Sequence, residues 1–294
     1  MQWTEATIDL IRAARDEDLG DAGDITAGLL PEGNRSVSAS VVSRAAGVIC
    51  GLALGPVIVA EFAVKLGSRV RFDPLLRDGD SVAPGTIVAH LIGPLAGVLA
   101  IERTLLNFLC RMSGVASLTR SYVEAARRGD AGAAVLDTRK TLPGWRELDK
   151  YSVVAGGGTN HRIGLYDAVL IKDNHLAGVP IERLASRLFE MLNALPHHPR
   201  PAFVEVEVDS IAQLREVLKV VGIDFVLLDN FSLDQLRDAV ALRDQAGLRG
   251  KLALEASGGV RLDTIAAIAA TGVDRISVGA ITHSAVALDL GLDL

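Results

Sequence analysis

The chain has 294 residues, of which 49% are hydrophobic and 22% are charged, and its net charge is −6. This composition is typical of a folded globular protein. Surfaces that bind nucleic acid are usually basic, and no apolar stretch reaches the roughly 18 residues of a membrane span, so we expect neither partner. The first residues lack the pattern of a signal peptide. Cys50 and Cys110 stand far apart, so we expect buried free thiols in a reducing, cytoplasmic location.

The chain up to about residue 115 is dominated by short β-type runs broken by Gly, Pro and Asp, as in antiparallel sheets. These runs lie at residues 36–44, 46–55, 68–76 and 85–93. Residues 78–93 have the rhythm of a biotinyl or lipoyl carrier hairpin without its lysine, so we predict a structural hairpin there.

Residues 101–111 are predicted to form an amphipathic helix. Its apolar face carries Ile101, Leu105, Phe108 and Leu109. Arg103 and Asn107 are four residues apart and share another face.

From about residue 133 the pattern changes to apolar strands, the later ones separated by amphipathic helices. The six strands are predicted at residues 133–138, 168–173, 203–208, 225–230, 252–257 and 275–280. This alternation is typical of a parallel sheet covered by helices. Six strands are fewer than the eight of a complete barrel. An open, incomplete parallel β/α barrel is therefore the first interpretation, and a doubly wound sheet is the second.

Polar residues lie on or follow all six predicted strands. The groups are Asp137-Thr138-Arg139-Lys140, Lys172-Asp173-Asn174-His175, Glu205 with Glu207, Asp229-Asn230, Ser257-Gly258-Gly259 and Ser277-Val278-Gly279-Ala280. A single Asp or Asn after a strand often only caps the next helix. Six such groups in order favour an active site, because the C-terminal ends of barrel strands meet at one mouth.

The cationic residues of this mouth predict a strongly anionic substrate. They are Arg139, Lys140, His161, Arg162 and Lys172. Arginine forks bind planar carboxylates through two hydrogen bonds. The lysines are better suited to a diphosphate or to a single carboxylate oxygen.

Two glutamates on one strand, Glu205 and Glu207, are predicted to face the barrel lumen together. Glu207, nearer the mouth, is expected to bind Mg²⁺ with Asp229, or to accept hydrogen bonds from ribose hydroxyls. A buried carboxylate is costly without a cation, so we expect Glu205 to pair with one of the lysines.

Glycines follow the last two predicted strands, at Gly258, Gly259 and Gly279. Their backbone N–H groups can approach an anion closely. We therefore predict that these loops bind a phosphate group, as the final loops of barrels often do.

Several sequence blocks resemble the quinolinate phosphoribosyltransferase family, also called nicotinate-nucleotide pyrophosphorylase (carboxylating). These blocks are EDLGDAGDIT, ERTLLNFLCRMSGVAS, LDTRKTLPGWR, KYSVVAGGGTNHRIGLYDAVLIKDNH, VEVEV, VLLDNF, EASGGV and GVDRISVGAITHS. The resemblance covers nearly the whole chain, in order. It implies an N-terminal α/β sandwich-like domain over residues 1–115 and an open barrel over residues 116–280. It also implies that a tail, at about 281–294, packs back on the first domain.

The family's reaction joins quinolinate to phosphoribosyl diphosphate with Mg²⁺ and gives nicotinate mononucleotide, diphosphate and CO₂ for de novo NAD synthesis. The resemblance implies that Arg139, His161, Arg162 and Lys172 bind quinolinate. Lys140, Glu207 and Asp229 would serve phosphoribosyl diphosphate and Mg²⁺. The 5′-phosphate would be held by Ser257, Gly258, Gly259 and Gly279. Arg103 would reach the active site of a neighbouring subunit in a homodimer.

The chain departs from the family pattern beside the cationic loop. Leu142 stands where a small polar residue, often Thr, is expected, and Trp145 stands where Leu is common. No charged residue of the pattern is missing.

Three other readings remain open. A look-alike family associated with molybdenum transport operons shares the fold and part of the motifs. A Schiff-base aldolase would use Lys172 or Lys140 as its amine. A sensor or carrier would bind a pyridine carboxylate or an oxyanion without a reaction.

Overall fold

The computed structural model describes residues 2–130, 132–195 and 200–294. The chain forms two compact units. The first contains Met1–Arg120, Thr141–Gly157 and Ile281–Leu294, and the second contains Ser121–Lys140 and Gly158–Ala280.

The two units differ from the predicted domains mainly in one segment, Thr141–Gly157, which packs with the first unit rather than with the barrel. This segment contains α4, Arg146–Ala155. Leu148 on α4 is fully buried in the first unit's core. Next to the helix, Trp145 stacks on Phe108 with ring centroids 4.9 Å apart. These apolar contacts explain why the segment belongs to the first unit.

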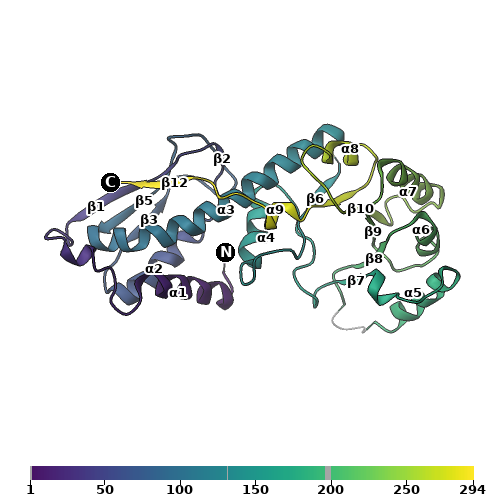
Figure 1. Ribbon diagram of the computed structural model, residues 1–294, viewed down its shortest axis with the longest axis horizontal. Helices are drawn as coiled ribbons and strands as arrows, with labels where there is room; N and C mark the ends of the chain where they lie inside the picture. The colour runs from purple at the N-terminus through teal and green to yellow at the C-terminus, as the bar shows by residue number, and fades with distance from the viewer. Residues whose placement is uncertain (1, 131, 196–199) are drawn as a thin grey trace. The chain divides into compact units, whose positions relative to one another are not determined.

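The first unit is built on a four-stranded antiparallel sheet in the order β12-β1-β5-β3 (Figure 1). The strands are β1 Ser36–Ser43, β3 Arg71–Pro74, β5 Ile87–Pro94 and β12 Leu290–Asp293. A two-stranded sheet joins β2 Gly47–Val48 to β4 Ser81–Val82. The first helices are α1 Glu5–Leu19 and α2 Gly55–Leu66, with a short 3₁₀ turn, η1 Ala27–Leu29, between them.

Two predictions in the first unit are wrong. The run at 46–55 is a strand only over β2, and α2 begins at its last residue. The predicted hairpin at 78–93 does not form, because β4 pairs with β2 whereas β5 pairs with β1 and β3. The helix α2 has recognisable ends: Pro56 lies in its first turn, and Gly67 ends it with φ 63° in the left-handed region.

The predicted helix at 101–111 is part of a longer helix, α3 Leu95–Gly129. Leu105 and Leu109 are fully buried, and Ile101 is 1% exposed, so the predicted apolar face is confirmed. Arg103 and Asn107 are exposed. The helix contributes its residues up to Arg120 to the first unit and the rest to the second.

The second unit is an open α/β barrel, as predicted. Its six strands are all parallel and lie in the order β6-β11-β10-β9-β8-β7, so β6 and β7 are the two ends of the sheet. They are β6 Ala134–Leu136, β7 Val169–Ile171, β8 Val204–Val208, β9 Phe225–Asp229, β10 Ala253–Ser257 and β11 Arg275–Ser277. Each lies within one of the six predicted strands.

Helices lie outside the sheet of the second unit (Figure 1). They are α5 Leu184–Asn193, α6 Ile211–Val217, α7 Leu233–Gln245 and α8 Ile265–Ala269. Two 3₁₀ turns, η2 Asp173–His175 and η3 Ile181–Arg183, follow β7, and α9 Ala280–His283 follows β11. This arrangement leaves the C-terminal ends of the strands open for a site.

Both cysteines are free, with Cys50 buried and Cys110 only partly buried. Across the described part of the chain, no helix has the length and apolar character needed to cross a membrane.

Candidate active site

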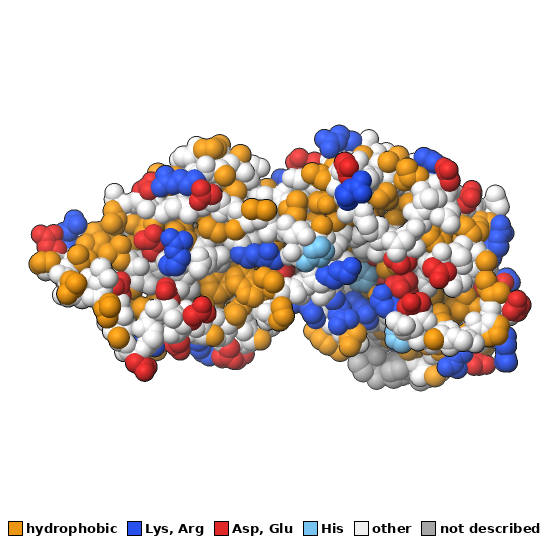
Figure 2. Space-filling view, in the orientation of Figure 1, with side chains coloured by type: hydrophobic (Ala, Val, Ile, Leu, Met, Phe, Trp, Pro, Cys, Tyr) orange, Lys and Arg blue, Asp and Glu red, His pale blue; other side chains and the backbone are white. Residues whose placement is uncertain are grey.

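The C-terminal ends of the barrel strands surround a cavity of about 430 Å³. This volume is in the usual range for sites that bind small molecules. Its walls are formed by Thr138, Arg139, Lys140, His161, Arg162, Leu170, Lys172, Glu207, Leu227, Asp229, Ser257 and Ser277. In Figure 2, Lys and Arg side chains gather beside Asp and Glu side chains on one face of this unit.

Eight predicted site residues line this cavity: Arg139, Lys140, His161, Arg162, Lys172, Glu207, Asp229 and Ser257. Gly258, Gly259 and Gly279 are not part of its wall, and Arg103 belongs to the other unit. Four further residues line the cavity: Thr138 and Ser277, which belong to the predicted polar strand ends but were given no role, and Leu170 and Leu227, which were not predicted. They could have been predicted from their positions on or directly after the barrel strands.

Two arginines dominate the cationic wall. Arg162 is only 8% exposed, and its Nη1 donates to the carbonyl oxygen of Ala168 at 3.3 Å. Burial lowers the pKa of Arg162, and the neighbouring charge of Arg139 lowers it further. The Nε of Arg139 is buried and has no hydrogen-bond partner among the described residues. A buried guanidinium beside a second, partly buried one favours the binding of an anion.

Short hydrogen-bonded turns hold these cations in place. Asp137, fully buried at the end of β6, accepts the backbone N–H of His161 at 2.8 Å. The hydroxyl of Thr138 accepts the N–H of Lys140 at 3.0 Å. Asp137 therefore joins the loop after β6 to the segment that carries His161 and Arg162.

The carboxylates lie across the cavity on β8 and β9. Glu207 forms an ion pair with Lys172. Asp229 accepts a hydrogen bond from the side-chain amide of Asn230 at 2.8 Å. Both carboxylates also line a neighbouring cavity of about 250 Å³, which includes Asp173 and Asp209. Their oxygen atoms therefore face space in which a cation could be held.

The prediction that Glu205 pairs with a lysine is wrong. Its Oε2 lies 2.9 Å from Nε2 of His161, and Lys172 pairs with Glu207 instead. Glu205 lies two residues before Glu207 on β8 and is fully buried, whereas Lys172 is only partly buried. The deeper carboxylate therefore meets the imidazole, and the one nearer the mouth meets the lysine.

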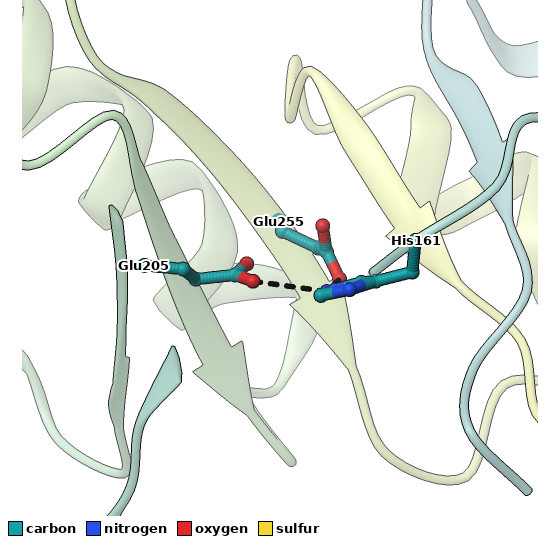
Figure 3. A group of neighbouring side chains, drawn as sticks. All are labelled: His161, Glu205 and Glu255. Atoms are coloured by element: carbon teal, nitrogen blue, oxygen red, sulfur yellow. Dashed lines mark ion pairs between the residues drawn. The ribbon is translucent and has the colours of Figure 1, made fainter. Parts of the chain in front are cut away.

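A network of charged side chains lies in the lumen below the cavity (Figure 3). Glu205 and Glu255 are both fully buried and both point to the ring of His161. Oε2 of Glu255 lies 2.8 Å from Nε of Arg275, whose guanidinium lies over the ring of Phe225. Burial raises the pKa of Glu205. For His161, burial lowers the pKa, but the two carboxylates outweigh this and raise it to about 9.

The loops after β9 and β10 pack closely through a glycine. Gly258 has φ 95°, and a Cβ there would lie 2.1 Å from Oδ1 and 2.9 Å from the backbone N of Asn230. Asn230 itself has a left-handed backbone with φ 57°. Gly259 has φ 59° but open space where a Cβ would stand. Gly258 is therefore needed for packing, which is a different reason from the predicted approach to a phosphate.

Two family models cover most of the chain. The quinolinate phosphoribosyl transferase N-terminal domain matches residues 24–113, and the C-terminal domain matches residues 115–293. The chain belongs to the quinolinate phosphoribosyl transferase family.

Relatives in this family match the chain over nearly its full length. The nicotinate-nucleotide pyrophosphorylase [carboxylating] of Mycobacterium leprae is 42% identical over 99% of this chain and 98% of its own length. The probable enzyme of the same name from Methanothermobacter thermautotrophicus is 38% identical, and the match covers 98% of each chain. The solved structure of the nicotinate-nucleotide pyrophosphorylase from Francisella tularensis is 35% identical. It superposes with a TM-score of 0.84 over 100% of this chain and 97% of that one.

Proposed function

We propose that this chain transfers the phosphoribosyl group of phosphoribosyl diphosphate to quinolinate, with loss of one carboxylate as CO₂. The products are nicotinate mononucleotide and diphosphate, in a step of de novo NAD synthesis. The observation that carries the proposal is the buried guanidinium of Arg162 beside the partly buried Arg139, in the cavity of a quinolinate phosphoribosyl transferase family member. Such a pair suits a substrate with two carboxylates on a flat ring.

Quinolinate would lie against the cationic wall. Arg139 and Arg162 would take its carboxylates through paired hydrogen bonds, with Lys172 and His161 completing the positive surface. Leu170 and Leu227 line the same cavity and would pack against the apolar faces of the pyridine ring. The Nε of Arg139, buried without a partner among the described residues, would gain one in this arrangement.

Phosphoribosyl diphosphate would occupy the side of the cavity that carries Lys140, Glu207 and Asp229. Its 5′-phosphate would be held at the ends of the last two barrel strands, by Ser257, Gly258 and Gly259 at the end of β10 and Gly279 after β11. Lys140 is exposed at the mouth and would neutralise the leaving diphosphate.

The donor set of the cavity fits a magnesium ion. Glu207 and Asp229 offer carboxylate oxygens that face two adjoining cavities, and Mg²⁺ prefers such oxygens together with water and substrate phosphates. Bound there, Mg²⁺ would supply positive charge against the phosphate oxygens.

The proposed reaction needs no covalent bond to the protein. The pyridine nitrogen forms a bond to the anomeric carbon while the bond from that carbon to diphosphate breaks. The sugar carries positive charge in the transition state, and the fixed carboxylates of Glu207 and Asp229 would stabilise it. The bond from the adjacent ring carbon to its carboxylate then breaks, and the electron pair stays on that carbon, where the positive charge of the quaternised nitrogen stabilises it. CO₂ leaves, and a proton from water completes the ring carbon.

We also propose that the working form is a homodimer in the cytoplasm. Arg103 is exposed on α3 and would act in the partner's active site. Two free cysteines are compatible with a reducing compartment.

The decisive experiment incubates the purified protein with carboxyl-labelled quinolinate, phosphoribosyl diphosphate and Mg²⁺. We expect labelled CO₂ and nicotinate mononucleotide in equal amounts, and neither product without phosphoribosyl diphosphate. Binding of quinolinate without CO₂ release would instead support a sensor or carrier. Trapping by borohydride with a carbonyl substrate would support an aldolase, although the ion pair with Glu207 uses Lys172 as a cation rather than as a neutral amine.

A further inference from the structure

His161 lines the cavity, yet its ring is held by the protein on both sides. Nε2 lies 2.9 Å from Oε2 of Glu205 and 3.4 Å from Oε1 of Glu255. Both carboxylates are fully buried, and His161 is 7% exposed. The Nε2 side of the ring therefore lies in an ion-pair contact with two buried carboxylates of the lumen.

The other ring nitrogen contacts the next residue. The backbone N–H of Arg162 donates to Nδ1 of His161 at 2.7 Å. A backbone amide always carries its hydrogen, so this contact requires a lone pair on Nδ1. The carboxylates raise the pKa of His161, while the amide of Arg162 opposes protonation of Nδ1. The amide contact holds the Nδ1 side of the ring against the backbone of Arg162.

We infer that His161 is a positioning residue, whose ring connects the backbone of Arg162 to Glu205 on β8 and so fixes the Arg162 guanidinium in the cavity. This inference rests on the proposed function, because it assigns Arg162 to a substrate carboxylate. It changes the expected role of His161 itself. Arg162 and Arg139 make the hydrogen bonds to substrate, and the ring of His161 holds Arg162 in place.

The surrounding contacts support a fixed ring. Asp137 on the loop after β6 accepts the backbone N–H of His161 at 2.8 Å, so backbone and ring are held from different strands. Phe203 packs its ring edge-on against His161 with centroids 5.5 Å apart. Few rotamers of the imidazole are compatible with all of these contacts.

The same three side chains have the composition of a metal site, since ligand atoms of His161, Glu205 and Glu255 lie within 4.8 Å of one another. Both oxygens of Glu255 are already engaged, Oε2 with Arg275 at 2.8 Å and Oε1 with the hydroxyl of Ser277. The guanidinium of Arg275 would also repel a cation. The contacts favour a positioning network over a metal centre.

The first test needs no substrate. Nitrogen NMR of the full chain with ¹⁵N-labelled histidine, with the His161 signals assigned by loss in His161→Asn, reports which ring nitrogen carries hydrogen. We expect hydrogen on Nε2 at neutral pH, and no change at either ring nitrogen when quinolinate is added. Loss of the hydrogen from Nε2, or ring signals that move when quinolinate binds, would overturn the inference.

The second test compares two amides that replace different halves of the ring. His161→Asn keeps an acceptor near the position of Nδ1, and His161→Gln keeps a polar group near Nε2. We expect quinolinate binding, measured by calorimetry, to be about tenfold weaker in both variants, because each breaks one end of the link between Arg162 and Glu205. Binding of phosphoribosyl diphosphate should change in neither. Quinolinate binding near wild type in either variant would overturn the inference.

Arg162→Ala supplies the matched background. If His161 acts through Arg162, His161→Gln should weaken quinolinate binding no further once Arg162 is alanine. An undiminished effect in that background would contradict the inference. If the wild-type protein binds no quinolinate at all, the proposed function fails, and the NMR measurement alone still decides the state of the ring.

Discussion

A buried guanidinium group beside a second guanidinium is unfavourable unless an anion accompanies them. Arg162 is buried, and the charge of the partly buried Arg139 lowers its pKa by Coulombic repulsion. The cost of placing them together is explained if a dicarboxylate binds there.

Arg139→Ala is therefore expected to weaken quinolinate binding by about 10- to 100-fold, since each hydrogen bond to a charged group contributes about 1.5–3 kcal/mol. Binding of phosphoribosyl diphosphate should change little, and calorimetry with each ligand separately measures both. Arg237→Ala, an exposed change on α7, is the control. Equal weakening of both ligands would remove Arg139 from the quinolinate site.

Glu207→Gln keeps the size of the side chain and removes its charge. We expect kcat to fall by about 10²-fold or more, because a group that stabilises the transition state is lost. The Mg²⁺ concentration for half-maximal rate should also rise. Initial rates over a Mg²⁺ series measure both effects, with Glu190→Gln on the surface of α5 as the matched control. An unchanged Mg²⁺ requirement would place the ion elsewhere.

Most of the residues that line the cavity were predicted from the sequence. The partner of Glu205, in the lumen beneath the cavity, was predicted wrongly. Strand ends are visible in sequence because charged residues interrupt apolar runs. The partner of Glu205 is not visible, because side chains from several strands share one lumen and spacing along the chain does not say which of them meet. His161 lies in a loop outside the strands, and only the fold brings its ring to β8 and β10.

At the scale of elements, the loops after β9 and β10 depend on each other. Gly258 fits against Asn230 only because it has no side chain, and Asn230 holds the carboxylate of Asp229. The packing of one loop therefore fixes a carboxylate on the neighbouring strand.

Gly258→Ala is expected to lower the free energy of unfolding by about 3 kcal/mol, because both its positive φ and the contact with Asn230 oppose a Cβ. Gly259→Ala, at a positive φ with open space, should cost only about 1 kcal/mol. Urea denaturation of both variants gives the comparison. Similar losses would show that backbone conformation alone matters at this turn.

The elements that were predicted wrongly lie in the first unit, where residues typical of strands stand next to a helix or pair with distant strands. All six barrel strands were predicted because each is a short apolar run with a polar end. The helix α2 was read as part of a strand region, since its first residues follow a run rich in β-type side chains. The hairpin prediction failed because β4 and β5 are adjacent in sequence but pair in different sheets, a choice made by distant strands.

At the scale of the whole molecule, the proposed dimer predicts complementation between inactive variants. Arg103→Ala and Arg162→Ala should each abolish most activity. In mixed dimers one of the two sites carries both wild-type residues, so about one quarter of wild-type activity should return at random pairing. Activity after co-refolding, with hybrids confirmed by mass spectrometry, provides the measurement. Proven hybrids without recovery would argue that Arg103 acts within its own subunit or not at all.

The strand β12 has a consequence for how the protein is made. It pairs with β1, residue for residue from Ser40 with Asp293 to Ser43 with Leu290, and completes the sheet of the first unit. A ribosome that builds the chain from its amino end therefore supplies every barrel residue before it supplies this strand. The unit that begins first in translation is the last to close its sheet, and its nascent β1 edge must remain unpaired on that side until residues 290–293 emerge.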